Sequence, residues 1–472
     1  MMPPPRNPED RPVGALLAPD ILELLEESPG AVAAETEELH PADLADVAEA
    51  LPPERVVAFL GALPKERAAD VLEYLDEELR TQVLEAMSSQ QAATLILQMT
   101  PDDRVDVLEE IGEERADEIL EQIPTDARRE TEALLRFDPA SAGGLMTTEF
   151  VSVPAKTTVE SALDSVRALA RTGRREAMYA VYTTDDDGRL NGVLSLRELL
   201  AAPTGSRLSD VAWTNIRSVP PTADREEVAR VTSEYDLMAV PVVSESGHMM
   251  GVVTVDDVID AIEEEQTEDV QKLGGMEALE EPYMQIGYVG MLRKRIGWLS
   301  ILFVGSLATA TAIGYFQDEL ARAAVLMLFI PLIISSGGNS GSQATSLIIR
   351  AMALGEITLR DWWRVARREL TSGLMLGILL GFLGVARVLI WQYMGWDDFG
   401  RYPGLVALTI GGALVGVVTF GSLAGSMLPF VLRRFGLDPA SASAPFVATL
   451  VDVTGLVIYF TVAVVVLRGR LL

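Results

Sequence analysis

The chain has 472 residues and divides into two parts of opposite charge. Residues 1–290 carry 60 acidic and 23 basic side chains, a net charge of −37, whereas residues 291–472 carry 9 acidic and 15 basic ones, a net charge of +6. The acidic part argues against a nucleic-acid partner, because phosphate binding needs positive charge. Since the chain has no cysteine and only two histidines, a metal site would have to use oxygen ligands.

The first region of the chain predicts a helical-repeat domain. Residues 1–32, rich in proline and then acidic, predict a flexible lead-in without a secretory signal, so we expect the acidic part to stay in the cytoplasm. Over residues 33–138 an apolar side chain recurs every 12 positions, often followed by a helix-start sequence such as PKER or TPDD. A unit of 12 residues holds one short helix and a turn, and stacked units form a superhelix. The recurring residues are Leu51, Leu63, Leu75, Met87, Met99, Ile111 and Ile123.

Two copies of a mixed α/β pattern follow, at residues 139–204 and 205–264. Each reads strand, helix, strand, glycine turn, strand, helix, and Gly192-Val-Leu-Ser-Leu of the first copy matches Gly251-Val-Val-Thr-Val of the second. This tandem pattern resembles a pair of CBS domains, which are regulatory modules that sense a ligand and commonly bind adenosine nucleotides. The resemblance therefore adds ATP as an expected ligand. Residues 265–292 then predict a connector, an acidic helix followed by a glycine-containing break.

The remaining residues, 293–472, predict a transmembrane domain that begins with the basic stretch Arg293 to Arg295. Its five apolar segments are each long enough, at ~1.5 Å per residue, to cross a ~30 Å apolar core. Arginines cluster between the second and third segments and between the fourth and fifth, which predicts that these loops and the N-terminal half are cytoplasmic. The five segments lie near 297–316, 322–348, 370–395, 404–432 and 445–467.

The second apolar segment contains the unusual sequence PLIISSGGNSGSQA, residues 331–344. Pro331 and the pair Gly337-Gly338 permit a kink, and Asn339 and Gln343 offer neutral oxygens to a hydrated ion. Because lipid cannot satisfy free backbone groups, we expect this segment to border a water-filled path. The alternative is a helix–helix contact through small residues.

A single carboxylate, Asp452, lies in the middle of the fifth segment. A charge at that depth costs ~2.5–3.5 kcal/mol even on the most lenient scale, so it should face a partner or water. Small residues stand one helical turn away, Ala448 before it and Gly455 after it, and they leave space for an ion. The alternative is a structural ion pair with Arg387 of the third segment.

Taken together, the two membrane motifs PLIISSGGNSGSQA and DPASASAPFVATLVDVTG, the acidic repeat, the tandem pair and the five segments resemble the MgtE-type magnesium transporters. The resemblance covers about residues 33–468 and implies a homodimeric Mg²⁺ channel in the cell membrane. It implies that Asp452 binds the ion largely through its water shell, near the Ala448 carbonyl and Asn339. Some relatives have an amide before the proline of the fifth segment, where this chain has Ala444.

The resemblance also implies regulation, with Mg²⁺ bound to acidic residues of the cytoplasmic half holding the channel closed. The pore-lining residues implied are Pro331, Gly337, Gly338, Asn339, Gln343 and Gly455. The regulatory ligands implied are Asp102, Asp106, Asp224, Glu226, Asp236, Asp257, Asp260, Glu268 and Asp269. Each of these acids taken alone is more often a solvent-facing residue than a ligand.

Three other functions remain open at this point. Cobalt, manganese or another divalent cation could replace magnesium, since all use oxygen ligands. A membrane-anchored nucleotide sensor is a second alternative, but an anchor has no reason to bury Asp452. A chloride channel with CBS domains is a third, although anion sites favour basic groups over a central acid. An enzyme is the least expected, because no nucleophile–base pair, phosphate loop or metalloprotease motif is visible.

Overall fold

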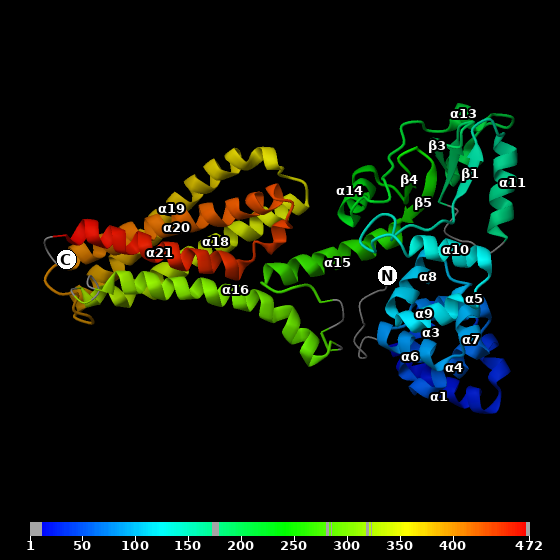
Figure 1. Cartoon of the computed structure of the whole chain (residues 1–472), viewed down its shortest axis with the longest axis horizontal. Coiled ribbons are helices and arrows are strands. Elements are labelled where there is room, and N and C mark those ends of the chain that lie inside the picture. Colours follow the sequence, from blue (N-terminus) through cyan, green and yellow to red (C-terminus); the bar gives the residue numbers. More distant parts are fainter. Residues whose placement is uncertain are drawn as a thin grey trace. The chain divides into compact units, whose positions relative to one another are not determined.

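The computed structural model describes residues 12–171, 179–279, 283–284, 286–317, 321 and 323–468. The first eleven residues of the expected lead-in and part of the expected connector, residues 280–282 and 285, lie outside these ranges. The chain forms two compact units, residues 1–265 and 266–472 (Figure 1). The first contains a helical domain and the tandem α/β pair, and the described residues of the second contain five long apolar helices, so the predicted fold class is confirmed.

The helical domain consists of short helices at the predicted 12-residue interval. Each of the seven recurring apolar residues lies at or just after a helix end, and each is at most 7% exposed. Because alternate helices pack on each other, as α5 does on α3 and α7, these residues form one continuous core. The helices are α1 Pro12–Glu27, η2 Pro29–Ala31, α2 Val32–Glu35, α3 Pro41–Ala50, α4 Pro53–Ala62, α5 Lys65–Glu73, α6 Glu77–Ala86, α7 Ser89–Ile96, α8 Pro101–Glu110, α9 Glu113–Leu120 and α10 Thr125–Leu134.

The expectation of a flexible lead-in over residues 1–32 is wrong for residues 12–27. These form α1, which buries Ala18, Ile21 and Leu25 in the core of the repeat. The three positions are spaced by three and four residues, so they lie on one helix face. The proline-rich composition of the segment hid this apolar face.

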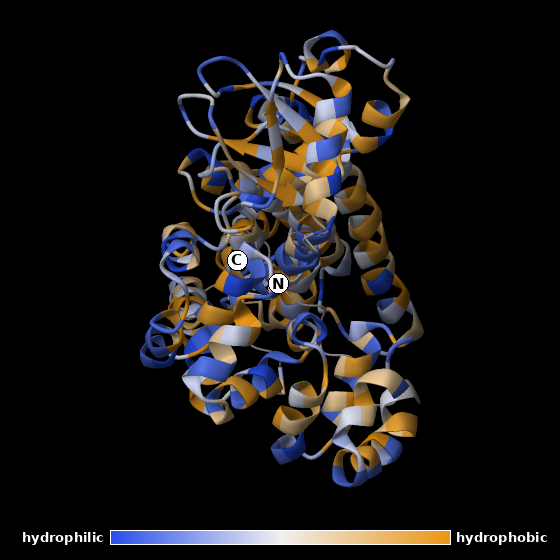
Figure 2. Ribbon diagram, turned by 90° about the vertical axis from the view of Figure 1, so that its right-hand side faces the viewer, coloured by the Kyte–Doolittle hydropathy of each residue, from blue (hydrophilic) through white to orange (hydrophobic). Residues whose placement is uncertain are grey.

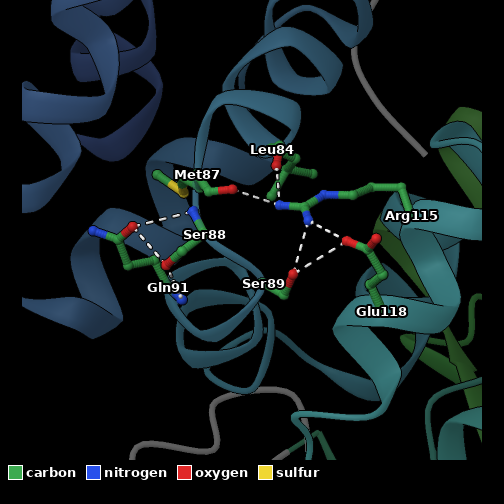
Figure 3. Close-up of polar contacts among 7 residues, drawn as sticks. All are labelled: Leu84, Met87, Ser88, Ser89, Gln91, Arg115 and Glu118. Carbon is green, nitrogen blue, oxygen red and sulfur yellow. Dashed lines mark hydrogen bonds and ion pairs between the residues drawn. The ribbon is translucent and has the colours of Figure 1, made fainter.

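Arginine side chains join repeats that are distant in sequence. The guanidinium group of Arg115 donates to the carbonyl oxygens of Leu84 and Met87, at 2.8 and 2.6 Å (Figure 3). These carbonyls belong to the end of α6, where a helix has no hydrogen-bond donors of its own left for them. Arg67 makes the equivalent contact with the carbonyl of Thr36, again 31 residues earlier.

The tandem pair is built from two small sheets that exchange an edge. In the first copy β1 is parallel to β2, and β2 is antiparallel to β3, whereas in the second β4 is antiparallel to β5. Thr147 of the first copy pairs with Val252 of β5, and Trp213 pairs in turn with Val193 of β3. The strands are mostly hydrophobic (Figure 2). The elements are β1 Val151–Pro154, α11 Val159–Ala170, β2 Ala180–Thr184, β3 Leu190–Ser195, α12 Leu196–Ala201, α13 Leu208–Val211, α14 Arg225–Tyr235, β4 Ala239–Val243, β5 Met249–Thr254 and α15 Val255–Leu273.

The two matched glycines of the sequence motif permit this exchange. A Cβ atom on Gly251 would stand 2.6 Å from the carbonyl oxygen of Thr147, and one on Gly192 would stand 2.9 Å from Ala212. Both distances are shorter than a van der Waals contact. Any other residue at either position would push the exchanged segment away.

Within the described part of the second unit, five helices are long and apolar enough to cross a membrane. α20 is the central helix, because α18, α19 and α21 all pack against it, and α16 packs on α21. α19 contributes four buried glycines to its contact with α20, at 373, 377, 381 and 384. The elements are α16 Tyr288–Tyr315, η4 Ala324–Phe329, α18 Ile330–Ala353, η5 Leu359–Asp361, α19 Trp362–Met394, α20 Pro403–Arg434, η6 Pro439–Ser441 and α21 Ala444–Leu467.

The expected interruption of the second apolar segment is not present. α18 runs without a break through the whole glycine-rich motif, and Pro331 stands in its first turn, where a missing N–H is harmless. The glycines instead permit close packing. A Cβ on Gly421 of α20 would stand 2.3 Å from the carbonyl oxygen of Gly337, and one on Gly425 would stand 2.2 Å from that of Gly341. The small-residue alternative therefore explains much of this motif.

Candidate functional site

The two membrane motifs meet beside Asp452. α18 and α21 pack together, and a Cβ on Gly338 would touch Ala448 at 3.6 Å, one helical turn before Asp452. Asp452 itself is half-buried in the single chain. Asn339, which follows Gly338 on α18, is exposed in the single chain.

The alternative pairing of Asp452 with Arg387 is wrong. Arg387 lies on α19, where its guanidinium group is 3.9 Å from Asp397 and 4.2 Å from the ring centre of Trp391. Among the described residues, Asp452 has no hydrogen bond or ion pair. A carboxylate at membrane depth without a partner in the described part of its chain is expected to face water, a cation or another subunit.

The exposed side of α18 carries a polar stripe. Ser335, Asn339 and Gln343 are all exposed and follow each other at intervals of four residues, which places them on one helix face. The amide nitrogen of Asn339 lies 3.5 Å from the hydroxyl of Ser335, a weak contact that leaves the amide available. Hydrocarbon cannot solvate these groups, so the stripe needs a wet or protein-covered environment.

Two of the expected pore-lining glycines face the interior of the helix bundle instead. A Cβ on Gly337 would stand 2.4 Å from Val417 and 2.8 Å from Val451, and one on Gly455 would stand 3.1 Å from Val417. Both glycines are buried where α18, α20 and α21 meet. Of the other expected pore-lining residues, Pro331 is exposed and Gly338 is buried against Ala448. The exposed polar side chains of α18 that could contact a hydrated ion are therefore those of the stripe.

The end of the connector helix lies at the start of α21. The ammonium group of Lys272 is 2.6 Å from a carboxylate oxygen of Asp438, which also caps η6, and Lys272 additionally pairs with Glu268. Leu273 packs with Ile349 of α18, with Ala440 of η6 and with Ala442, which directly follows η6. The contact joins the connector to the ends of both helices that carry the membrane motifs.

Gly275 turns the chain directly after this contact. Its φ of +78° lies in the left-handed region, and its N–H donates to the carbonyl of Lys272. A Cβ here would stand 3.2 Å from Pro445 in the first turn of α21. Glycine therefore both ends α15 and allows the connector to approach α21.

A second group of acidic residues lies where the helical domain packs on the second α/β copy. Val105 and Leu134 belong to one apolar cluster with Val258 and Ala261 of α15, which establishes the contact. Burial, together with the charge of Asp103, raises the pKa of Glu73 to about 8.

The same interface perturbs the carboxylates of α15. Burial and the charge of Asp103 raise the pKa of Asp257 to about 7, despite a hydrogen bond from Thr254, and burial raises that of Asp260 to about 6. Burial also raises the pKa of Asp103. Carboxylates that destabilise each other when ionised favour a proton or a cation between them.

The structure gathers some of the predicted regulatory acids and separates others. Asp257 and Asp260 lie in the interface. The charge of Asp106 of α8 contributes to the raised pKa values of Asp103 and Glu264. Asp102 is only 6% exposed. The other predicted acids lie on α14 and on the later part of α15: Asp224, Glu226, Asp236, Glu268 and Asp269.

On α14 the predicted acids stand at opposite ends. Asp224 caps the N-terminus by accepting the N–H of Glu226 at 2.9 Å, whereas Asp236 ends the helix with a φ of +51°. The eleven residues of α14 lie between them, so they are ~18 Å apart along the helix axis. Within the described part of the chain, no three acidic or histidine side chains already form a metal cage.

Four residues that were not predicted from the sequence take part in these two contacts. Glu73 and Asp103 join the acidic interface, and Lys272 and Asp438 join the connector to the membrane unit. Asp103 lies between two predicted acids in the sequence, but only the packing of α8 on α15 distinguishes it from them. For Lys272, the signal was a single base in a strongly acidic helix.

Comparison with known proteins gives matches along most of the chain. A profile described as "Divalent cation transporter" (MgtE) matches residues 330–462, one described as "MgtE intracellular N domain" matches 39–140, and the CBS domain profile matches 142–205 and 208–264. The magnesium transporter MgtE of Thermus thermophilus is 42% identical over 342 residues, which cover 72% of this chain and 73% of that relative. The transporter of the same name from Enterococcus faecalis is 34% identical over 340 residues, 72% of each chain.

Two solved structures resemble the first unit. One is described as the soluble part of a magnesium transporter; it is 29% identical, with a TM-score of 0.50, and the match covers 55% of this chain and 99% of that one. Another is described as the cytosolic domain of the Mg²⁺ channel MgtE in complex with ATP; it is 35% identical, with a TM-score of 0.49, and the match covers 52% of this chain and 99% of that one.

Proposed function

Since the chain belongs to the MgtE family of divalent cation transporters, we propose that it is a membrane channel that carries Mg²⁺ into the cytoplasm. In this proposal, cytoplasmic Mg²⁺ bound to the acidic unit closes the channel. The observation that carries it is Asp452, a carboxylate at membrane depth that lacks a partner in the described part of its own chain and lies on α21, which packs against α18, the helix with the polar stripe. A transporter, rather than an enzyme, fits this arrangement.

The chemistry of the ion supports these roles. Mg²⁺ holds six waters at ~2.0–2.1 Å and releases them reluctantly, so a pore serves it best with few charges and many neutral oxygens. In our proposal Asp452 supplies the charge. The carbonyl oxygen of Ala448 and the amide oxygens of Asn339 and Gln343 accept hydrogen bonds from the water shell.

A homodimer completes this pathway. The polar stripe of α18 is exposed in the single chain, and because lipid cannot satisfy its polar groups, the stripe needs water or a partner surface. A second copy would place two Asp452 carboxylates about one axis and give a divalent ion two negative charges. Nucleotide binding to the CBS pair, with ATP as the candidate, is a further proposal that rests on the presence of that module.

The acidic interface supplies the proposed sensor. Ionised Glu73, Asp103 and Asp257 repel each other when α8 packs on α15, and a divalent cation would remove that repulsion. A ligand shifts a conformational equilibrium only by binding one state more tightly, which a cation between docked carboxylates does. The contact of Lys272 with Asp438 would transmit the arrangement of α15 to the start of α21.

The transport proposal is tested by flux into liposomes that contain the purified full-length protein and a Mg²⁺-sensitive dye. We expect the wild type to pass Mg²⁺ and Asp452→Ala to abolish the flux while remaining folded. Asp398→Ala is the matched control, because this acid lies in the α19–α20 loop and only caps Gly400. Unchanged flux in Asp452→Ala would remove the pore assignment, and preference for cobalt or manganese would change the assigned ion.

The gating proposal is tested separately by limited proteolysis of the intact protein. We expect millimolar Mg²⁺ to protect the helical domain and the CBS pair, and we expect Asp103→Asn with Asp257→Asn to reduce the Mg²⁺ dependence. Asp185→Asn with Asp187→Asn, in an exposed turn of the first CBS domain, is the control. Equal cleavage of the wild type with and without Mg²⁺ would count against the sensor.

A further inference from the structure

The cytoplasmic end of α19 carries an arginine-rich surface that transport and gating do not explain. Residues 350–368 contain five arginines against two carboxylates. All five arginines are exposed: Arg350, Arg360, Arg364, Arg367 and Arg368. One of the two acids, Asp361, already has partners: its carboxylate accepts the backbone N–H of Thr358 and pairs with Arg364 at 3.0 Å.

The arginine surface continues directly into an apolar one on the same helix face. At 100° per residue, Arg364 and Arg368 lie within about 40° of Met375 and Phe382 around the axis of α19, and Arg367 lies within about 80° of them. The two apolar side chains are 72% and 68% exposed. The opposite side of the helix carries the glycines that pack on α20. One continuous face therefore offers cationic groups followed by bare hydrocarbon.

The length of α19 places the arginines outside the apolar core of a membrane. Its 33 residues span ~50 Å, whereas the core is ~30 Å thick, so about two turns at an end extend into the headgroup region. Trp362 and Trp363 are exposed and begin the helix. Tryptophan favours this interfacial depth because it has both an apolar body and a polar N–H.

α19 lies on the side of the bundle away from the proposed pore. α19 packs on α20 (Figure 1). Asp452 and Asn339 lie on two other helices, α21 and α18, which pack on α20 and on each other. A homodimer built around Asp452 would therefore leave the outer face of α19 open to lipid. An occupant of this face needs a negative head and a long apolar part.

We propose that the cytoplasmic end of α19 binds an anionic phospholipid, with its phosphate held by Arg364, Arg367 and Arg368 and its acyl chains lying along Met375, Ile378 and Phe382. A soluble anion would use the arginines but not the apolar face. A zwitterionic lipid would use the apolar face but would gain little from three positive charges. Charge and shape together select an anionic lipid of the cytoplasmic leaflet.

Native mass spectrometry of the full-length protein in neutral detergent tests this proposal, with phosphatidylglycerol and phosphatidylcholine as probes. We expect the wild type to retain phosphatidylglycerol preferentially. Each arginine is expected to contribute about fivefold, so Arg364→Gln with Arg367→Gln should weaken phosphatidylglycerol binding by about 25-fold and leave phosphatidylcholine unaffected. Arg364→Lys with Arg367→Lys should retain most of the preference.

The other cytoplasmic loop provides a control of equal charge. Arg433→Gln with Arg434→Gln removes two exposed arginines at the end of α20 and should change phosphatidylglycerol binding less than threefold. Equal losses in both double variants, or wild-type binding in the α19 variant, would overturn the proposal. Competition by soluble glycerol phosphate as strong as by the lipid would assign the site to a free anion instead. Because no flux is measured, these results stand apart from the transport proposal.

Discussion

Replacement of Gly421 by alanine tests whether the glycine motif of α18 is a packing surface. A Cβ at Gly421 would stand 2.3 Å from the carbonyl oxygen of Gly337, whereas an ordinary contact begins at 3.4 Å. The backbone atoms cannot rotate away, so α18 and α20 must separate locally by roughly 1 Å. Overpacking of this kind costs about 1–3 kcal/mol, and we expect a corresponding loss of thermal stability.

Tryptophan fluorescence during thermal unfolding of the intact protein is a suitable assay for this loss. Five of the six tryptophans lie in residues 291–472, so the signal reports mainly on the membrane unit. Gly404→Ala is the matched control, because a Cβ at this position of α20 meets nothing within 4 Å. If Gly421→Ala melted together with the wild type, or if both variants shifted equally, the packing account of the motif would be refuted.

Three further predictions concern the acidic unit and the connector. Arg115→Gln should destabilise the helical domain by about 1–3 kcal/mol, because carbonyls at the end of α6 lose their donor. The control Arg128→Gln, which removes an exposed ion pair, should change the stability by less than about 1 kcal/mol. Chemical unfolding followed by circular dichroism compares the two variants, and equal effects would contradict the capping role. The docked interface binds more protons than separated carboxylates, whose pKa is about 4, so docking without Mg²⁺ should be strongest below pH 4 and weaken as the pH rises through 7 to 8. Proteolysis at pH 6 and pH 8 should therefore show the larger protection by Mg²⁺ at pH 8. A larger protection at pH 6 would contradict the raised pKa values of the docked carboxylates. Lys272→Gln should increase Mg²⁺ flux at cytoplasmic Mg²⁺ concentrations that close the wild-type channel, and the exchange Lys272→Asp with Asp438→Lys should restore closure. The control Lys156→Gln, which removes an exposed ion pair, should not change the flux. Unchanged closure in Lys272→Gln would show that the contact does not hold the closed state.

The sequence predicted those features that repeat or that violate the rules of their surroundings. The 12-residue period of buried apolar residues follows from one helix and turn per unit, and the two matched glycines mark the exchanged strands of the CBS pair. Asp452 was found because a carboxylate in an apolar segment is costly. Each of these signals is local, so a single sequence contains it.

Features that depend on which surfaces meet were missed or misjudged. The glycines of PLIISSGGNSGSQA suggested a broken helix, since composition alone does not distinguish a kink from a close contact with a second helix. Asp103 differs from its acidic neighbours only through the packing of α8 on α15. Lys272 and Asp438 are 166 residues apart, and no local pattern joins them.

The role of Asp452 is the central claim, and replacement of its charge at constant shape tests it most directly. Mg²⁺ flux should be measured in liposomes for the wild type, Asp452→Asn and Asp452→Glu, with folding verified by size-exclusion chromatography. A site that holds a hydrated cation by charge predicts that the asparagine variant loses the flux and that the glutamate variant keeps part of it. Flux through Asp452→Asn at the wild-type rate would contradict the account.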